Sequence, residues 1–566
     1  MTYTDAVKPT RLRRALLALV EAVAAGVACV ASLWFCYPLH WERAGTEILA
    51  YGGIYAAGDV GGTLFLAKRA ALGETGSWTR LVQAPTGLDL SVEFPNLLPT
   101  DLIGWFVQGW GLPLGYSLAL LALCASNGLA VHLTARLLGA TRTPALVGGV
   151  LAASVPLVAD ELLRGRPVSA WWAPAVLAVG LGLGALRGWG RIWLAVPAGA
   201  CLWIALESYA FAPVLLGGWA VAGVLAACWG RPGTMLRALI VGPVALAMAS
   251  PAIRGALAAA DARRARTSTA FTTFDLPTDL AALSMPEILS TAVGSGYLER
   301  IPVAVTALGL VGALLGWRRA RQWLPPLVGA VVVLAVSLGP QPDLGWWQLK
   351  PGRSVPYTAV MQTSELVRSV PRPTRWGLAG TQLLALWAAM ALSQRRRRWA
   401  WAGLALGGGY LGLVQARPQQ VDDTMPWPPL PGMAEIDGTD LLLDLPLLFP
   451  EDQSTYLLTA AWPIPRVNPD SGDLRQWTAR LKRDEHPLLM AAAAVQQGEE
   501  VPADVLAELA IEIPEVEGLG LRRAVLHLEA GEHWPKAWLQ LMDDIDAEAL
   551  YWDDELVVYA LDGTKR

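Results

Sequence analysis

The sequence predicts an α-helical polytopic membrane protein of about eleven transmembrane helices, followed by a C-terminal extracytoplasmic α/β domain. Of its 566 residues, 54% are hydrophobic and 16% are charged, whereas soluble domains carry roughly 25% charged residues. The apolar residues fall in runs of about 16 to 24 that are separated by short connections bearing arginine. This pattern is typical of membrane-spanning helices and excludes a single soluble enzyme domain.

Charge divides the chain after residue 416. Residues 417–566 hold 11 Lys/Arg and 29 Asp/Glu, a net charge of −18, and the rest holds 33 and 19, a net charge of +14. We therefore expect a transmembrane domain over 1–416 and a soluble domain over 417–566. An overall charge of −4 and only five cysteines exclude a basic nucleic-acid-binding protein and a disulfide framework, so no nucleic acid partner is expected.

The first span is expected at residues 15–36, after several cationic residues. Lipoprotein cleavage before Cys29 is the alternative, which the apolar sequence beyond Cys29 disfavours. The remaining spans are expected at 113–135, 145–159, 169–186, 192–206, 210–229, 236–258, 301–317, 323–339, 377–393 and 399–416.

Arginine in the short connections predicts a cytoplasmic N-terminus in the inner (plasma) membrane, and the odd number of spans places the tail outside. The weakest division separates 192–206 from 210–229. Merging these two runs would reverse every later loop and place the block Arg395–Arg398 outside, against the positive-inside rule. Three outer loops are long, and loops of this length usually carry function. They are expected at 38–112, 259–300 and 340–376.

Local patterns predict further elements in the outer parts of the chain. Residues 63–73 mix apolar side chains with Lys68 and Arg69 and end at glycine, which indicates a short helix lying in the membrane interface. In the tail, apolar runs and helical periodicity predict a mixed α/β structure. Its strands are expected at 440–445, 523–529 and 555–561, and its helices at 473–497 and 533–545.

Several common catalytic motifs are missing from this chain. It contains no GxxxxGK[ST], HExxH, CxxC or GxSxG sequence, so NTPase and hydrolase activities lose their best support. Its five histidines have no spacing that would suggest zinc. No cofactor is therefore expected, and a divalent metal has no motif in its favour.

The first outer loop gathers polar and acidic residues, of which Asp59 is the strongest candidate. Small residues flank it on both sides, in the sequence Ala57 to Gly62, and allow another chain or a ligand to approach closely. A carboxylate there can act as a general base towards an acceptor hydroxyl at the membrane surface. The other interpretation is that Asp59 caps the helix that follows or ends a turn. Further members of this polar group are Glu42, Glu47, Asp89, Glu93 and Asn96.

Ionisable residues elsewhere suggest two further interpretations. The third long loop carries Lys350, Arg353, Arg368, Arg372 and Arg375. Guanidinium groups there can hold the phosphate of a lipid carrier, and generic contact with anionic headgroups is the alternative. Within the predicted spans, Glu21 and His132 are the main ionisable residues. A histidine near Asn127 indicates an interhelical hydrogen bond more readily than a proton relay.

The order of these features resembles the bacterial polytopic proteins of the GT-C glycosyltransferase superfamily, and within it the large group related to YfhO-like membrane proteins. The resemblance covers nearly the whole chain, although each motif is short. The similar stretches are Gly58-Asp59, Ala84 to Leu90, Gly115 to Gly139, Trp171 to Pro174, Pro356 to Arg375, Leu443 to Pro446 and Arg523 to Leu561.

The resemblance implies an inverting glycosyltransferase that moves a sugar from a polyprenyl-phosphate-linked donor to an extracytoplasmic glycan, lipid or protein acceptor. In that superfamily the acidic residue of the first outer loop is the proposed base, and Asp59 matches it. Arg372 or Arg375 would hold the carrier phosphate. This chain lacks the paired acidic residues of better-known members at Asp59, so no metal is assigned. Asp89, Glu93 and Asn96 complete the expected substrate-binding residues.

A protein that keeps this fold without catalysis is the alternative function, as a lipid-handling or polysaccharide-export component of the membrane. Fold alone does not decide between the two. A transporter is less well supported, because ionisable residues inside the predicted spans are few.

Overall fold

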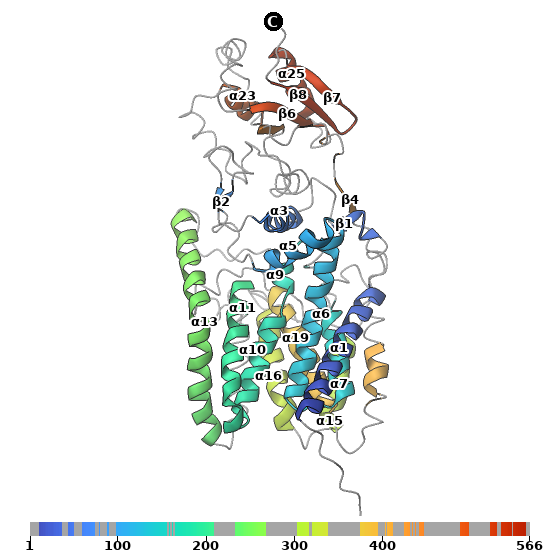
Figure 1. Ribbon diagram of the computed structural model, residues 1–566, viewed down its shortest axis with the longest axis vertical. Helices are drawn as coiled ribbons and strands as arrows, with labels where there is room; N and C mark the ends of the chain where they lie inside the picture. The colour runs from blue at the N-terminus through green and yellow to red at the C-terminus, as the bar shows by residue number, and fades with distance from the viewer. Residues whose placement is uncertain are drawn as a thin grey trace, which may run out of the picture. The chain divides into compact units, whose positions relative to one another are not determined.

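A computed structural model describes most of the membrane part of the chain and the core of its tail (Figure 1). The described residues are 11–36, 43–49, 59–73, 78–79, 88–89, 98–155, 158, 161, 165–208, 232–267, 303–315, 320–337, 374–393, 402, 404–410, 424–428, 430, 433, 436, 441–445, 487–496, 521–528, 534–545 and 547–561. Contacts within the chain define two compact units. The first comprises 1–41, 119–162 and 167–421, and the second comprises 42–118, 163–166 and 422–566. The boundary expected at 416/417 stays a prediction.

Helices follow the apolar runs of the first unit. Among the described residues, four segments are long and apolar enough to cross a membrane, namely Leu16–Cys36, Leu114–Leu137, Trp189–Glu207 and Gly233–Gly255. They coincide with four of the expected spans, while the total of about eleven stays a prediction and the run 210–229 lies outside the described residues. The helices are α1 (Arg11–Cys36), α6 (Leu114–Leu137), α7 (Arg142–Ala153), α9 (Pro167–Ala170), α10 (Ala173–Leu186), the 3₁₀ helix η2 (Trp189–Leu194), α11 (Ala195–Ser208), α13 (Pro232–Thr267), α15 (Val303–Leu315), α16 (Ala320–Ser337) and α19 (Thr374–Ala391).

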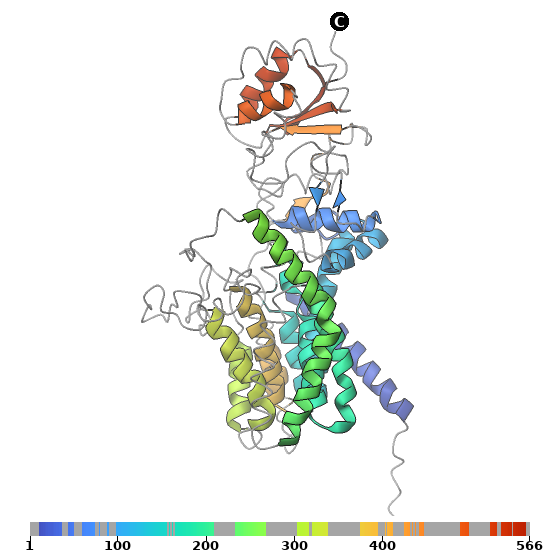
Figure 2. The ribbon, with the colours of Figure 1, turned by 90° about the vertical axis from the view of Figure 1, so that its left-hand side faces the viewer.

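Two of these helices extend into segments that were expected to be outer loops. Helix α13 continues to Thr267 and therefore includes the first part of the expected loop 259–300 (Figure 2). Helix α19 begins at Thr374, just inside the expected loop 340–376. In both cases the helix runs beyond the apolar residues that define the span, because helical hydrogen bonding does not require apolar side chains.

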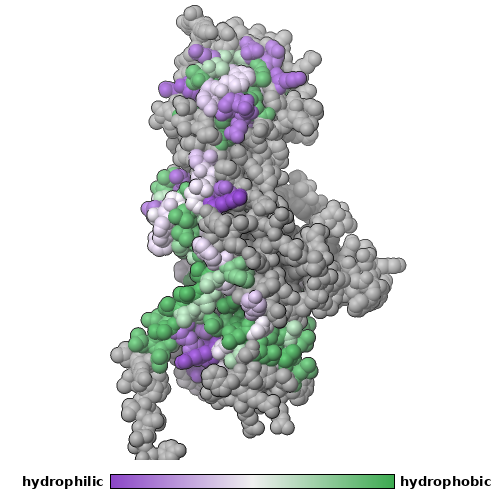
Figure 3. All heavy atoms as spheres, turned by 90° about the vertical axis from the view of Figure 1, so that its right-hand side faces the viewer, coloured by the Kyte–Doolittle hydropathy of each residue, from purple (hydrophilic) through white to green (hydrophobic). Residues whose placement is uncertain are grey.

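Small residues allow close contact between α1, α6 and α7. A Cβ atom placed on Gly128 would lie 2.6 Å from Sγ of Cys29, and one placed on Gly149 would lie 2.6 Å from the carbonyl oxygen of Gly128. Such contacts are typical of membrane helices, where packing rather than hydrophobicity holds helices together. Outward-facing side chains of α1 such as Leu19 and Val27 are exposed, and Figure 3 shows hydrophobic surface on the helical part of one face.

A buried asparagine determines where α10 begins. The amide nitrogen of Asn127, in the middle of α6, donates to the carbonyl oxygen of Ala170 at 2.8 Å. Its carbonyl oxygen accepts from the backbone N–H groups of Trp172 and Ala173, both at 2.8 Å. The expected span 169–186 is therefore divided into α9 and α10, and Asn127 satisfies the backbone groups that the break leaves without helical partners.

Ionisable side chains inside the spans are paired across helices. The carboxylate of Glu21 in α1 forms ion pairs with Arg136 of α6 and with Arg142 of α7, the latter at 3.0 Å. Nε2 of the buried His132 lies 3.6 Å from the same carboxylate. Glu21 thus joins three helices. The interhelical hydrogen bond was expected from His132, whose ring nitrogens have no hydrogen-bond partner among the described residues. Asn127 forms such a bond instead, with the start of α10.

The first outer loop pairs with the beginning of the tail. Strand β1 (Glu47–Leu49) is antiparallel to β4 (Thr424–Pro426), with Ile48 opposite Met425. Hydrogen-bonded strands must lie on the same side of a membrane, so residues 47–49 and 424–426 share one side. The number of spans between the two strands, and the separation of 192–206 from 210–229, stay predictions.

The tail contains a four-stranded sheet in the order β5-β6-β8-β7. Strands β5 (Leu441–Leu445) and β6 (Leu521–His527) are parallel, and β8 (Leu556–Ala560) pairs antiparallel with both β6 and β7 (Glu548–Trp552). The tail also contains the helices α23 (Pro487–Gln496) and α25 (Trp534–Asp544). Each expected strand has a counterpart, whereas β7 was not expected. Residues 473–486 of the expected helix 473–497 lie outside the described residues. That this region forms an independent domain stays a prediction.

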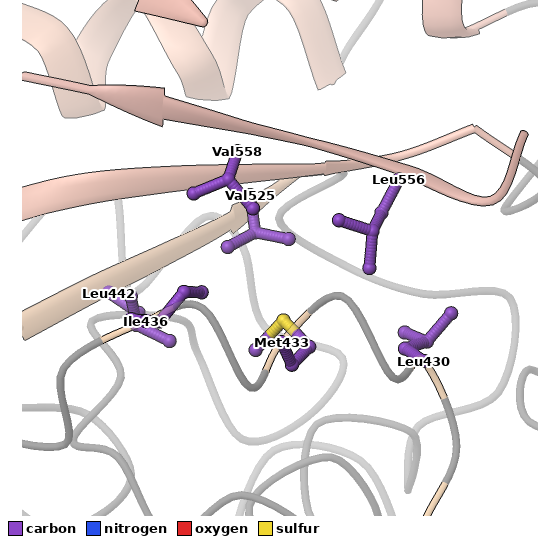
Figure 4. Packing of buried hydrophobic residues seen from close by; sticks show 7 residues of the cluster. All are labelled: Leu430, Met433, Ile436, Leu442, Val525, Leu556 and Val558. Atoms are coloured by element: carbon purple, nitrogen blue, oxygen red, sulfur yellow. The ribbon is translucent and has the colours of Figure 1, made fainter. Parts of the chain in front are cut away.

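One face of this sheet holds a closed apolar cluster. Figure 4 shows side chains of the segment before β5 lying against side chains of the sheet. All of them are buried, namely Leu430, Met433, Ile436, Leu442, Val525, Leu556 and Val558. Asp444 lies opposite Val525 in the parallel pairing, and its Oδ1 is 3.1 Å from Nε2 of His527. Both side chains are fully buried, so the tail core includes a polar pair at the carboxyl ends of β5 and β6.

Candidate functional site: the helix pair of the first outer loop

Helix α3 (Asp59–Ala71) begins at the strongest candidate residue of the sequence. An acidic residue at a helix N-terminus interacts favourably with the exposed N–H groups and the helix dipole. At the other end, Gly73 adopts φ +81°, and its N–H donates to the carbonyl oxygen of Ala70 at 3.0 Å. A helix is present where one is expected at 63–73, but it begins four residues earlier and ends at Ala71, two residues before the glycine. That it lies in the membrane interface stays a prediction. Both interpretations of Asp59, base and cap, are compatible with this position.

The first turn of α3 is held tightly by a distant turn of the chain. Gly165 has φ +71°, and a Cβ atom there would collide with the backbone N and Cα of Val60. Oγ1 of the buried Thr63 donates to the carbonyl oxygen of Gly165 at 2.6 Å. The residue after Asp59 therefore packs directly against glycine backbone, which restricts where the start of α3 can lie.

Gly165→Ala is expected to destabilise the protein by about 2 to 5 kcal/mol, because positive φ costs an L-residue roughly 1 to 2 kcal/mol and overpacking adds roughly 1 to 3. Thermal unfolding of the purified protein measures this. Gly139→Ala is the matched control, since Gly139 also has positive φ, +91°, but a Cβ there would meet only a guanidinium nitrogen of Arg187, at 3.5 Å. An equal loss in both variants would show that contact with Val60 does not matter.

Helix α5 (Leu98–Trp110) packs along α3 through small residues. A Cβ atom placed on Gly104 would lie 2.5 Å from Cβ of Ala70. Arg69 of α3 is buried. Burial raises the pKa of the Asp101 carboxyl on α5, and the nearby positive charge of Arg69 offsets part of that rise. The helix pair thus brings the buried guanidinium of Arg69 near the carboxylate of Asp101.

The sequence reasoning missed three residues of this part of the chain. Arg69 was noted only as part of a helix, and Asp101 was not singled out. Glu161 is 4% exposed and precedes the Gly165 turn in sequence. A pair of acidic residues, Asp160 and Glu161, between the apolar runs 145–159 and 169–186 was a usable signal, because carboxylates are rare at such positions unless they have a role.

The remaining expected site residues are only partly described. Asp89 ends β3 (Leu88–Asp89) and lies opposite Trp78 of β2 (Trp78–Thr79). Arg375 is the second residue of α19. Glu93, Asn96 and Arg372 lie outside the described residues. Their assembly with Asp59 therefore stays a prediction. Among the described residues no group of three or more His, Cys, Asp or Glu side chains could hold a metal ion.

Comparison with known proteins identifies no family model and no curated protein that matches this chain. Solved structures do match. The Archaeoglobus fulgidus oligosaccharyltransferase AglB, in complex with an inhibitory peptide and a dolichol-phosphate, has a TM-score of 0.47 and 13% identity over 90% of this chain and 69% of its own. ArnT from Cupriavidus metallidurans, bound to undecaprenyl phosphate, has a TM-score of 0.48 and 12% identity over 96% and 98%.

A third neighbour is the mycobacterial arabinofuranosyltransferase AftD, with a TM-score of 0.46 and 15% identity over 95% of this chain and 41% of its own. These neighbours are GT-C glycosyltransferases. The expected relation to the narrower YfhO-like group stays a prediction. With TM-scores below 0.5 and identities of 12–15%, the likeness does not establish the reaction of this chain.

Proposed function

We propose that this protein is an inverting membrane glycosyltransferase that moves a sugar from a polyprenyl-phosphate-linked donor to an extracytoplasmic acceptor. The observation that carries the proposal is the position of Asp59 at the start of α3, where Val60 packs against Gly165. A base must be held in place to work efficiently, and this packing restrains the backbone next to Asp59. The chain also has helices suited to a membrane, as a lipid-linked donor requires.

In the proposed reaction the acceptor hydroxyl attacks the anomeric carbon of the sugar while Asp59 takes the hydroxyl proton. The bond from that carbon to the phosphate oxygen breaks, and polyprenyl phosphate leaves with the electron pair. Arg372 or Arg375 stabilises the negative charge that develops on the phosphate. Asp89, Glu93 and Asn96 orient the sugar or the acceptor. The reaction takes place outside the plasma membrane, with the N-terminus of the chain in the cytoplasm.

Lipid that copurifies with the full-length protein tests the donor side of this proposal. Mass spectrometry should detect a polyprenyl phosphate or its glycosylated form with the wild-type protein. Arg372→Ala or Arg375→Ala should reduce its amount by roughly 10- to 100-fold, because a charge-assisted hydrogen bond to phosphate contributes about 1.5 to 3 kcal/mol.

Arg254→Ala is the matched control for this experiment. Arg254 is exposed on α13, and its Nε donates to the carbonyl oxygen of Ser250 in the same helix, at 3.4 Å. Its loss should leave the copurified lipid unchanged. Recovery of ordinary phospholipids alone, from every variant, would argue against a polyprenyl donor and favour a lipid-handling or export component.

A further inference from the structure

The connection between α10 and α11, residues 187–194, is a folded structure with fixed arginines. Nη1 of Arg187 donates to the carbonyl oxygen of Leu138 at 2.6 Å. Nε of Arg237, from the start of α13, donates to the carbonyl oxygen of Leu186 at 2.7 Å. Leu186 and Leu194 are buried in one apolar cluster with Val241. The connection is therefore anchored to three helices.

Positive charge accumulates at this connection. The connection carries Arg187 and the exposed Arg191, and Arg237 of α13 contacts its beginning. Burial lowers the pKa of the Arg187 guanidinium, and the like charge of Arg191 lowers it further, as expected for two neighbouring cations. The guanidinium of Arg237 lies 5.9 Å from the ring centre of Trp189, a cation–π distance.

These three arginines differ from Arg136 and Arg142, two described arginines at another short connection of this unit. Arg136 and Arg142 both form ion pairs with Glu21. For Arg187, Arg191 and Arg237 the described part of the chain supplies backbone carbonyls, a threonine hydroxyl and an indole ring, but no carboxylate pairs with them there. The positive charge of these three arginines is therefore available to an anion that is not among the described residues.

The side chains around the arginines indicate the source of that anion. Trp189 and Trp193, both on the connection itself, are 51% and 63% exposed. Large exposed apolar side chains beside arginine are suited to acyl chains, and tryptophan favours the depth of lipid headgroups. These apolar side chains would not strengthen the binding of a soluble anion.

We propose that Arg187, Arg191, Arg237 and Trp189 form a binding site for the phosphate of an anionic phospholipid, with Trp193 against its glycerol and upper acyl chain. Guanidinium groups bind phosphate oxygens in a bidentate fork, and basic pockets between membrane helices bind anionic headgroups. The site belongs to the leaflet at this end of the helices, which is the cytoplasmic leaflet in the predicted topology. It is separate from the outer loop and does not depend on glycosyl transfer.

Native mass spectrometry of the full-length protein in detergent tests this site. Phosphatidylglycerol and phosphatidylcholine with the same acyl chains are titrated separately, and inorganic phosphate is added in a third series. The wild-type protein should bind phosphatidylglycerol more tightly. Arg191→Gln should weaken that binding about fivefold, because each surface arginine strengthens the binding of an anionic lipid by about that factor. The double variant Arg191→Gln with Arg237→Gln should weaken it about 20-fold.

Arg254→Gln, on the same helix as Arg237, is the matched control and should leave phosphatidylglycerol binding unchanged. Arg191→Gln carries the test if the double variant folds poorly, because Arg191 is exposed. Equal binding of the two lipids, or wild-type binding of phosphatidylglycerol by Arg191→Gln, would overturn the proposal. Displacement of the lipid by millimolar inorganic phosphate would also overturn it, because the site would then be one for a soluble anion.

Discussion

Asp59→Asn is expected to lower sugar transfer from a polyprenyl phosphate donor by about 10²- to 10⁴-fold, the usual cost of removing a positioned base. The substitution keeps the size and shape of the side chain but removes its basicity. Asparagine is also as good a helix cap as aspartate, so α3, which begins at this residue, should form normally. Transfer is measured with the purified protein in proteoliposomes, with a radiolabelled donor and thermal unfolding measured in parallel.

This substitution separates the two interpretations of Asp59. If Asp59 acts only as a cap, Asp59→Asn keeps full transfer, and Asp59→Ala loses about 1 kcal/mol of stability. If it is the base, both variants lose transfer, while Asp59→Asn keeps its stability. Asp554→Asn, at an exposed position between β7 and β8 of the tail, is the control for a general loss of negative charge, and it should stay active. Full complementation of a deletion strain by Asp59→Asn would refute the enzymatic proposal.

Asn127→Leu is expected to reduce stability by about 3 kcal/mol or more. Leucine has the same branched arrangement of heavy atoms but leaves the carbonyl of Ala170 and the N–H groups of Trp172 and Ala173 without the partners that Asn127 supplies. A buried backbone group that loses its hydrogen bond costs about 1 to 3 kcal/mol, and surrounding lipid cannot replace it. The apparent melting temperature in detergent should fall by several degrees.

Ser126→Ala is the matched control for this prediction. The hydroxyl of Ser126 accepts a hydrogen bond from the indole N–H of Trp171, at 2.9 Å, and donates to the carbonyl oxygen of Leu123 in its own helix, at 2.6 Å. Both side chains are only partly buried, so water or lipid headgroups can substitute, and a loss of about 1 kcal/mol or less is expected. A similar small effect of Asn127→Leu would show that the start of α10 does not depend on the asparagine.

Local patterns in the sequence were sufficient for most helices and for three strands of the tail. An apolar run such as 113–135 identifies α6 because a segment of that length can satisfy its backbone in lipid only as a helix. The glycine at position 73 marks the end of α3 because it tolerates the positive φ of a helix terminus. The small residues around Asp59 likewise identified it as a candidate, although the sequence did not predict which residues contact it in a site.

Contacts between distant residues were decided by tertiary structure alone. The pairing of β1 with β4 joins residues 47–49 to 424–426, and the division between α9 and α10 depends on Asn127, more than forty residues earlier. The short strand β7 has mostly exposed side chains and exists because β8 supplies its hydrogen bonds. Local periodicity records which face of a segment is apolar, whereas a hydrogen-bond partner or a close approach such as Gly165 to Val60 arises only when the chain folds back on itself.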